Sequence, residues 1–344
     1  MKRAYVVAVL GAVVGTFLGL ASCSEANTTG PVGGVKDTGT TGDAGKADFG
    51  TNDTGGGGGD DTGGGDGGPK CPSVVKTGSI ADLRNPASGK TAIVNDGIKL
   101  TGVVATSIKY RTRNPKVAGD PCQFAVFVAD ANATFQPWSG IQVISYGKNA
   151  EARDGGGVTC PIGTDFIPED VKPGDLLDLV GTYTEFGPTA DTCGKGTPAL
   201  PPPLPGKQPQ VFKVCELTKK GAGTLPVPAD VTPSQLETKA LDAGAAADEV
   251  LKWTGGLVRI KDVTSDSALT FGNFKIAGST LEVTNTIYYR GAATSPTVAK
   301  GDTFTSITGV SLLDFCTWTL APAKCTDMVP ATGSGAKCPT PTGG

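Results

Sequence analysis

The chain has 344 residues, a formal net charge of −3 at neutral pH and no histidine. Without histidine it lacks the commonest general base and the commonest protein metal ligand, which excludes Ser-His-Asp and Cys-His catalytic sites. The acidic excess lies in residues 24–70, which hold eight acidic and three basic side chains. Residues 71–344 hold 25 of each, so we expect no overall field there that would steer a polyanion.

The N-terminal segment has the layout of an export signal, because Lys2 and Arg3 precede an apolar run from Ala4 to Leu20. The run ends in Leu20-Ala21-Ser22-Cys23, which resembles a bacterial lipobox. In that family the cysteine thiol receives a diacylglycerol, cleavage occurs before it, and the new amine is usually acylated, typically with palmitate. The resemblance implies a lipoprotein signal peptide at residues 1–22 and a lipid anchor at Cys23. A plain signal peptide with a chance cysteine is the alternative.

Ser24 stands where an aspartate would resemble the signal that retains lipoproteins in the inner membrane. The lipobox resemblance therefore implies the outer membrane, on its periplasmic face or at the cell surface. Two or three acyl chains would make release negligible, since each buried methylene contributes ~0.8 kcal/mol.

The lipidated cysteine begins a linker, residues 23–70. It is rich in Gly, Asp and Thr and too poor in apolar groups to offset the entropy cost of ordering. A flexible chain of this length spans ~35–40 Å. Its aspartates suggest calcium binding, but they lack the alternating order and final bidentate carboxylate of calcium loops. We expect a disordered, solvated tether.

Eight cysteines follow Cys23, and an even number in an exported chain indicates disulfides. Zinc is disfavoured because the chain has no CxxC pair and no histidine. Proximity and the internal repeat described below favour three pairs and leave a fourth that would join the ends of the folded region. These predicted pairs are Cys122–Cys160, Cys193–Cys215, Cys316–Cys325 and Cys71–Cys338.

Short β-rich runs separated by turn residues begin near residue 97 and predict five strands. A glycine interrupts the first run and another lies in the fourth, where strands can coil sharply. A short helix, Ser79–Arg84, is predicted before them. The strand runs are Ile98–Ile108, Phe124–Ala129, Ile141–Tyr146, Leu176–Phe186 and Gln210–Leu217.

The same order recurs downstream, which predicts an internal duplication. The V-x-x-G-D turn at Val171–Asp175 returns at Val298–Asp302, and a cysteine pair flanks the fifth strand region in each copy. Thr232-Pro233-Ser234-Gln235 has the signature of a helix start, and the helix is predicted to continue toward Leu251. The matching strand runs are Gly256–Ile260, Leu269–Ile276, Leu281–Tyr288, the run after Asp302, and the region between Cys316 and Cys325.

Five short strands with these glycines suit a small closed barrel, of which the OB-fold is the common form. The string SIADLR…GIKLTGVVAT…FAVFVAD…WSGIQV…VKPGDLLDLVGTYTEF resembles OB-fold domains that accompany secreted bacterial nucleases. The resemblance covers residues 79–226 well and 230–328 more weakly, and its motifs carry no catalytic residues. It implies an all-β protein with two tandem five-stranded OB-like barrels and short accessory helices. The expected divisions are 71–228 and 229–330, with a C-terminal tail at 331–344.

We expect no enzyme and no cofactor or metal. Three neighbouring carboxylates, Asp165, Glu169 and Asp170, are interpreted as an exposed loop, although a carboxylate pair is the form catalysis would take without histidine. Phe124, Phe127 and Trp138 are interpreted as core and hairpin anchors in preference to a stacking platform.

OB-folds usually bind ligands on the face of strands 2 and 3, between the 1–2 and 4–5 loops. In the first copy the 1–2 loop concentrates cations around one aromatic ring, which could grip phosphates and stack a base. A solvated loop is the alternative interpretation. The candidate binding residues are Lys109, Tyr110, Arg111, Arg113 and Lys116 in the first copy, and Tyr288, Tyr289 and Arg290 in the second.

The sequence thus predicts a non-catalytic binding lipoprotein of the cell envelope. Besides the membrane, its possible partners are single-stranded nucleic acid, polysaccharide or an envelope protein. The alternative is a structural or protein-interaction component of a cell-surface assembly. The step from fold to ligand is an analogy, since one fold serves many functions.

Overall fold

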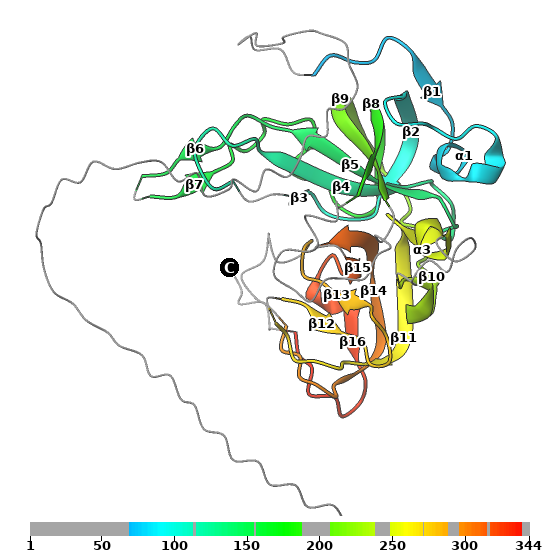
Figure 1. The fold of residues 1–344 in the computed structure, drawn as a ribbon, viewed down its shortest axis with the longest axis vertical. Coiled ribbons are helices and arrows are strands. Elements are labelled where there is room, and N and C mark those ends of the chain that lie inside the picture. Colours follow the sequence, from blue (N-terminus) through cyan, green and yellow to red (C-terminus); the bar gives the residue numbers. More distant parts are fainter. Residues whose placement is uncertain are drawn as a thin grey trace, which may run out of the picture. The chain divides into compact units, whose positions relative to one another are not determined.

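A computed structural model describes residues 69–112, 115–154, 156–187, 207–237, 248–270, 272–287, 296–314 and 317–338 (Figure 1). The signal segment, Cys23 and nearly all of the tether lie outside these residues. The described part is mostly β-sheet with few helices, as the sequence predicts. None of its helices is long and apolar enough to cross a membrane.

The first sheet pairs its strands in the order β1-β2-β8-β9-β5-β4-β3, and β2 also pairs with β4. Hydrogen-bonded neighbours therefore run from β2 through β8, β9, β5 and β4 and back to β2. The pairs β1–β2 and β5–β9 are parallel and the others are antiparallel. A small separate sheet pairs β6 with β7. The strands are β1 (Val75–Thr77), β2 (Gly97–Ala105), β3 (Tyr110–Arg111), β4 (Gln123–Ala129), β5 (Gly140–Tyr146), β6 (Glu151–Ala152), β7 (Val158–Thr159), β8 (Asp175–Phe186) and β9 (Gln208–Ala222).

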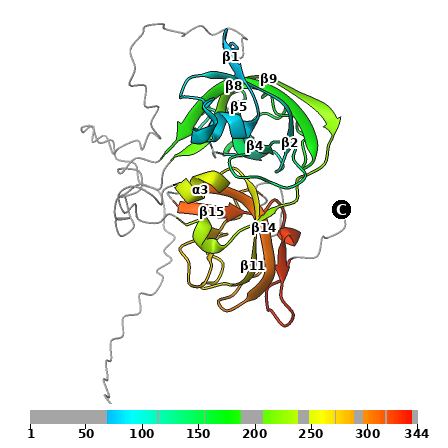
Figure 2. The same cartoon turned by 90° about the vertical axis from the view of Figure 1, so that its right-hand side faces the viewer.

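Strand alternation builds the core of this sheet. Val126 and Val128 of β4 face inward with Leu177 and Leu179 of β8, and all four are buried. A bulge between Leu100 and Val103 bends β2 where Gly102 has a φ of +63°. The long strands β8 and β9 curve strongly around the core (Figure 2).

The second sheet repeats this order of pairings. Its path is β10-β11-β14-β15-β13-β12, with β16 on β14, and β13–β15 is parallel. An isolated antiparallel bridge between Ser265 and Ile276 joins the end of β11 to the residue after β12. The strands are β10 (Ala229–Asp230), β11 (Leu257–Thr264), β12 (Phe274–Lys275), β13 (Glu282–Val283), β14 (Thr303–Asp314), β15 (Thr317–Ala321) and β16 (Met328–Pro330).

Each sheet also begins with the same arrangement before its first long strand. A short strand pairs in parallel with that strand, β1 with β2 and β10 with β11, and a helical turn lies between them. Ser79 caps the first turn by accepting from Asp82 N, and Gln235 accepts from Thr232 N at 2.8 Å in the second. Both helix starts agree with the sequence prediction. The helical elements are α1 (Ile80–Arg84), η1 (Pro86–Ser88), η2 (Pro233–Gln235), α3 (Asp248–Trp253) and η3 (Cys325–Asp327).

The disulfides confirm one predicted pairing and correct three. Cys122–Cys160 is present as predicted. Cys215, however, bonds Cys71 with a Cα–Cα distance of 5.3 Å, and Cys325 bonds Cys338 at 5.7 Å. The predictions Cys193–Cys215, Cys316–Cys325 and Cys71–Cys338 are therefore wrong for these four cysteines. These predictions relied on proximity along the chain, but folding brings the segment before β1 against β9 across a sequence separation of 144. Cys193 and Cys316 lie outside the described residues.

Candidate functional site

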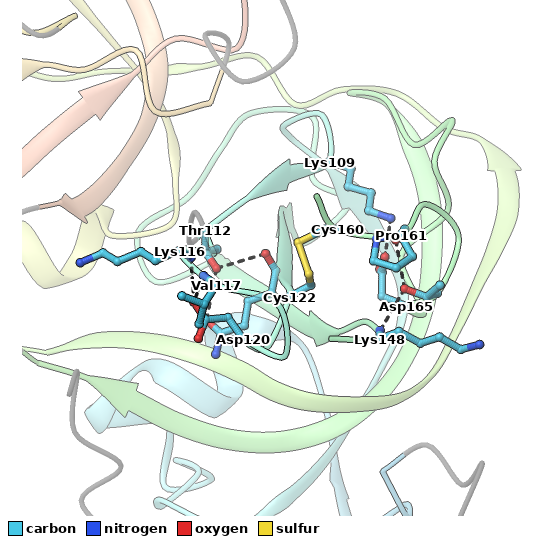
Figure 3. Close-up of a disulfide and its surroundings, with 12 residues drawn as sticks. Lys109, Thr112, Lys116, Val117, Asp120, Cys122, Lys148, Cys160, Pro161 and Asp165 are labelled. Atoms are coloured by element: carbon cyan, nitrogen blue, oxygen red, sulfur yellow. Dashed lines mark hydrogen bonds and ion pairs between the residues drawn. A yellow bond between two sulfur atoms is a disulfide. The ribbon is translucent and has the colours of Figure 1, made fainter. Parts of the chain in front are cut away.

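Lys109 and Lys116, the two ends of the loop predicted to bind a ligand, lie near the Cys122–Cys160 disulfide (Figure 3). We call the two segments that it joins, residues 115–122 and 147–163, the braced loops; the second contains the β6–β7 hairpin. Both cysteines are buried and pack with Ala150, Phe124 and Val158. The disulfide therefore fixes the base of a hairpin that extends beyond the ends of β4 and β5 (Figure 1).

Hydrogen bonds from backbone N–H groups hold the first braced loop in one shape. The carboxylate of Asp120 accepts from the N–H groups of Lys116 at 2.7 Å and Val117 at 3.1 Å. Gly119 N donates to Ala150 O, and Ala150 N donates to Asp120 O, both at 2.8 Å. The loop backbone is thus fixed by hydrogen bonds, and the exposed Lys116 side chain is directed away from the disulfide (Figure 3).

Lys109, the first predicted binding residue, lies in a buried ion-pair cluster. Its side chain is 6% exposed, and its Nζ lies 2.5 Å from Asp165 and 2.6 Å from Glu169. It also donates to Ile167 O at 2.9 Å and lies 4.5 Å from the centre of the Phe124 ring. These partners occupy the ammonium group, so a ligand would have to displace them to use it.

The carboxylates of this cluster respond differently to burial. Burial raises the pKa of Asp165, whose side chain is fully buried, although hydrogen bonding and charge from Lys109 oppose the shift. Burial acts in the same direction on Glu169, but Lys109 and the N–H of Gly163 outweigh it and lower that pKa. The third carboxylate of the predicted exposed loop, Asp170, pairs with Lys219 at 2.7 Å.

Tyr110 lies in the contact between the two sheets. Its ring is stacked on Phe127 with 5.9 Å between centroids and 9° between planes, and Tyr110 is 4% exposed. Its hydroxyl accepts from Gln142 Nε2 at 2.6 Å. The ring predicted to stack a nucleobase therefore packs inside the protein, in one cluster with Val310 and Leu312 of β14.

Of the remaining predicted binding residues, some lie among the described residues and others do not. Arg111 is half-buried in β3, opposite Phe124 of β4. Arg113, Tyr288, Tyr289 and Arg290 lie outside the described residues. The structure therefore places Lys109, Tyr110, Arg111 and Lys116, which are close together in the sequence, in four different environments. Whether this surface binds a ligand stays a prediction.

Sequence reasoning missed the joint between the sheets. Arg84, at the end of α1, is 5% exposed and donates to Leu251 O and Thr254 O at 2.7 Å and also to Gly140 O. It thereby caps carbonyls at the end of α3, a favourable place for a cation. Gly140 and Gly255 meet backbone to backbone, since a Cβ on Gly140 would lie 2.3 Å from Gly255 O.

A buried chain of amides continues this joint. Gln142 Oε1 accepts from Gln210 Nε2 at 2.6 Å and from Gln208 Nε2, and Gln208 Oε1 accepts from Leu313 N of β14 at 2.7 Å. Such a chain demands matched geometry, because a buried amide left without a partner costs more than the bond contributes. No short motif marks these residues in the sequence.

No group of three or more His, Cys, Asp or Glu side chains suited to a metal ion occurs among the described residues. No protein-family model, no curated protein and no solved structure matches this chain.

Proposed function

We propose that the chain is a non-catalytic lipoprotein of the outer membrane that presents two OB-like barrels to another protein of the envelope. Cys23 supplies the lipid anchor and residues 24–70 the tether in this proposal. The sequence resemblance to a lipobox supports the anchor. The pairing ring of β2, β8, β9, β5 and β4, with its bulge at Gly102, supports the barrel interpretation of the first sheet.

The observation that favours a protein partner is the covered outer face of β4 and β5. Phe127 and Ile144 point away from the first core and are buried against Val310, Leu312 and Ala321 of the second sheet. In an OB-like barrel this is the face that usually receives nucleic acid or sugar. Here the molecule uses it to join its own two halves, and the joint at Arg84 and the glutamine chain stiffens the connection.

The charge of the braced loops points the same way. They carry three cations, Lys116, Lys148 and Arg153, and three carboxylates, Asp120, Glu151 and Asp154. A surface that binds nucleic acid needs an excess of cations, because phosphate contacts supply most of its affinity. A balanced, covalently braced surface suits a protein partner with mixed charges.

Site-specific photo-crosslinking in intact cells tests the proposal. A photoreactive residue at Lys116 or Arg153, both exposed on the braced loops, should give a discrete protein adduct. The same residue at the exposed Lys99 of β2 is the matched control and should give none. Adducts of equal yield at all three positions would contradict a specific surface.

Binding of single-stranded DNA across a salt series tests the competing ligand. We expect no binding at physiological salt by the chain carrying Cys23→Ala. A micromolar affinity that falls steeply with salt, and disappears in Arg111→Gln with Arg113→Gln, would replace the protein partner with nucleic acid.

A further inference from the structure

The tether joins the fold through a weak element. β1 has three residues, pairs in parallel with β2 through Val75–Thr77 and Gly97–Lys99, and follows Val74, which is 80% exposed. Among the described strands, β1 pairs with no other. Without a covalent bond ahead of β1, tension arriving along the chain before Pro69 would load these few hydrogen bonds first.

A covalent bond lies directly before this weak strand. Cys71 is exposed and bonds Cys215, which is 7% exposed within β9. β9 is a 15-residue strand held by β8 on one side and β5 on the other. The point where the tether enters is thereby fixed to one of the most extensively paired strands of the first sheet.

We infer that the Cys71–Cys215 disulfide is a strap that carries tension between the tether and the second half of the chain. Tension between residue 70 and any point after Cys215 passes through the bond, and residues 72–214 stay in a closed covalent loop. This inference rests on the proposed function, because a lipid-anchored chain that holds a partner on its braced loops is under tension. The braced loops lie inside the closed loop, so that tension divides between the chain after Cys71 and the chain before Cys215 and does not fall on β1 alone.

The length of chain that the strap keeps closed can be measured. Its loop has a sequence separation of 144, within which Cys122–Cys160 closes a separation of 38. Breaking the strap alone therefore frees about 106 residues, or about 350–380 Å at 3.3–3.6 Å for each residue. Breaking both bonds frees about 144 residues, or about 475–520 Å.

Optical-trap extension of single molecules tests the inference. One handle is attached to the N-terminus of the full chain carrying Cys23→Ser, and the other to a ligation tag inserted between Thr224 and Leu225, which are both exposed. The oxidised chain should show no extension of the lengths given above. Cys71→Ser with Cys215→Ser should add an event of about 350–380 Å.

The matched control is Cys122→Ser with Cys160→Ser, which should leave the limiting extension unchanged because its loop lies inside the strap. If the strap variant does not fold, reductant added to the folded chain in the trap gives the same test, with about 475–520 Å expected. An oxidised chain that already extends by these lengths would overturn the inference. The measurement uses neither lipid nor partner, so failure of the proposed function would leave its result unaffected.

Discussion

Removal of the Arg84 guanidinium should destabilise the protein far more than removal of a surface arginine. Arg84→Met keeps most of the side-chain volume but leaves the carbonyls of Gly140, Leu251 and Thr254 without their donor. Each buried carbonyl without a partner costs roughly 1–3 kcal/mol. Burial of the charged guanidinium is itself unfavourable and lowers the pKa of Arg84 to about 10. Methionine removes this cost of burying a charge, which offsets part of the loss.

We therefore expect the free energy of unfolding to fall by about 2–4 kcal/mol. Urea unfolding of the oxidised chain, followed by tryptophan fluorescence, measures it. Trp138 lies 5.7 Å from the Arg84 guanidinium and Trp253 belongs to α3, so both report on the joint.

Arg259→Met is the matched control, because Arg259 is partly exposed and pairs with Asp230 at the surface. Its unfolding midpoint should stay close to that of the wild-type chain. Equal free energies of unfolding for wild-type and Arg84→Met, within about 0.5 kcal/mol, would refute the argument that these carbonyls depend on Arg84.

Three further predictions concern other parts of the chain. Lys109→Met should lower the free energy of unfolding by about 3–5 kcal/mol, because it leaves Asp165 buried without its cation. Adding Asp165→Asn should recover much of this loss in urea unfolding, and no recovery would mean that the cluster does not act as an ion pair. Cys23→Ala should move the protein from the membrane to the soluble fraction of broken cells, and persistent sedimentation with membranes would remove the lipid anchor. The hydrogen bond from Arg259 is the main reason that the pKa of Asp230 is lowered to about 2. The ionised carboxylate therefore stabilises the fold at pH values above its ordinary pKa of about 3.8, and this stabilisation is lost as the pH falls toward 2. Arg259→Gln should raise this pKa in a carboxyl NMR titration, and an unchanged pKa would contradict the assigned cause.

The braced loops show how far sequence reasoning reached at the candidate site. Cys122–Cys160 was predictable because both cysteines lie near one predicted hairpin. The environment of Lys109 was not, since its partner Asp165 lies 56 positions along the chain, in a loop predicted to be exposed. Charge and spacing identified the loop but could not distinguish a cation facing solvent from one paired beneath the surface.

The sequence by itself determined the elements: the main strands of both sheets, the capped turns at Ser79 and Thr232, and the duplicated order. These depend on alternation and capping, which act over a few neighbouring residues. Only the tertiary structure decided that Cys71 meets Cys215, that Arg84 caps α3, and that Tyr110 is covered by β14. These contacts join residues that are far apart in the chain, and they form because packing two sheets together must bury apolar faces and satisfy every polar group between them.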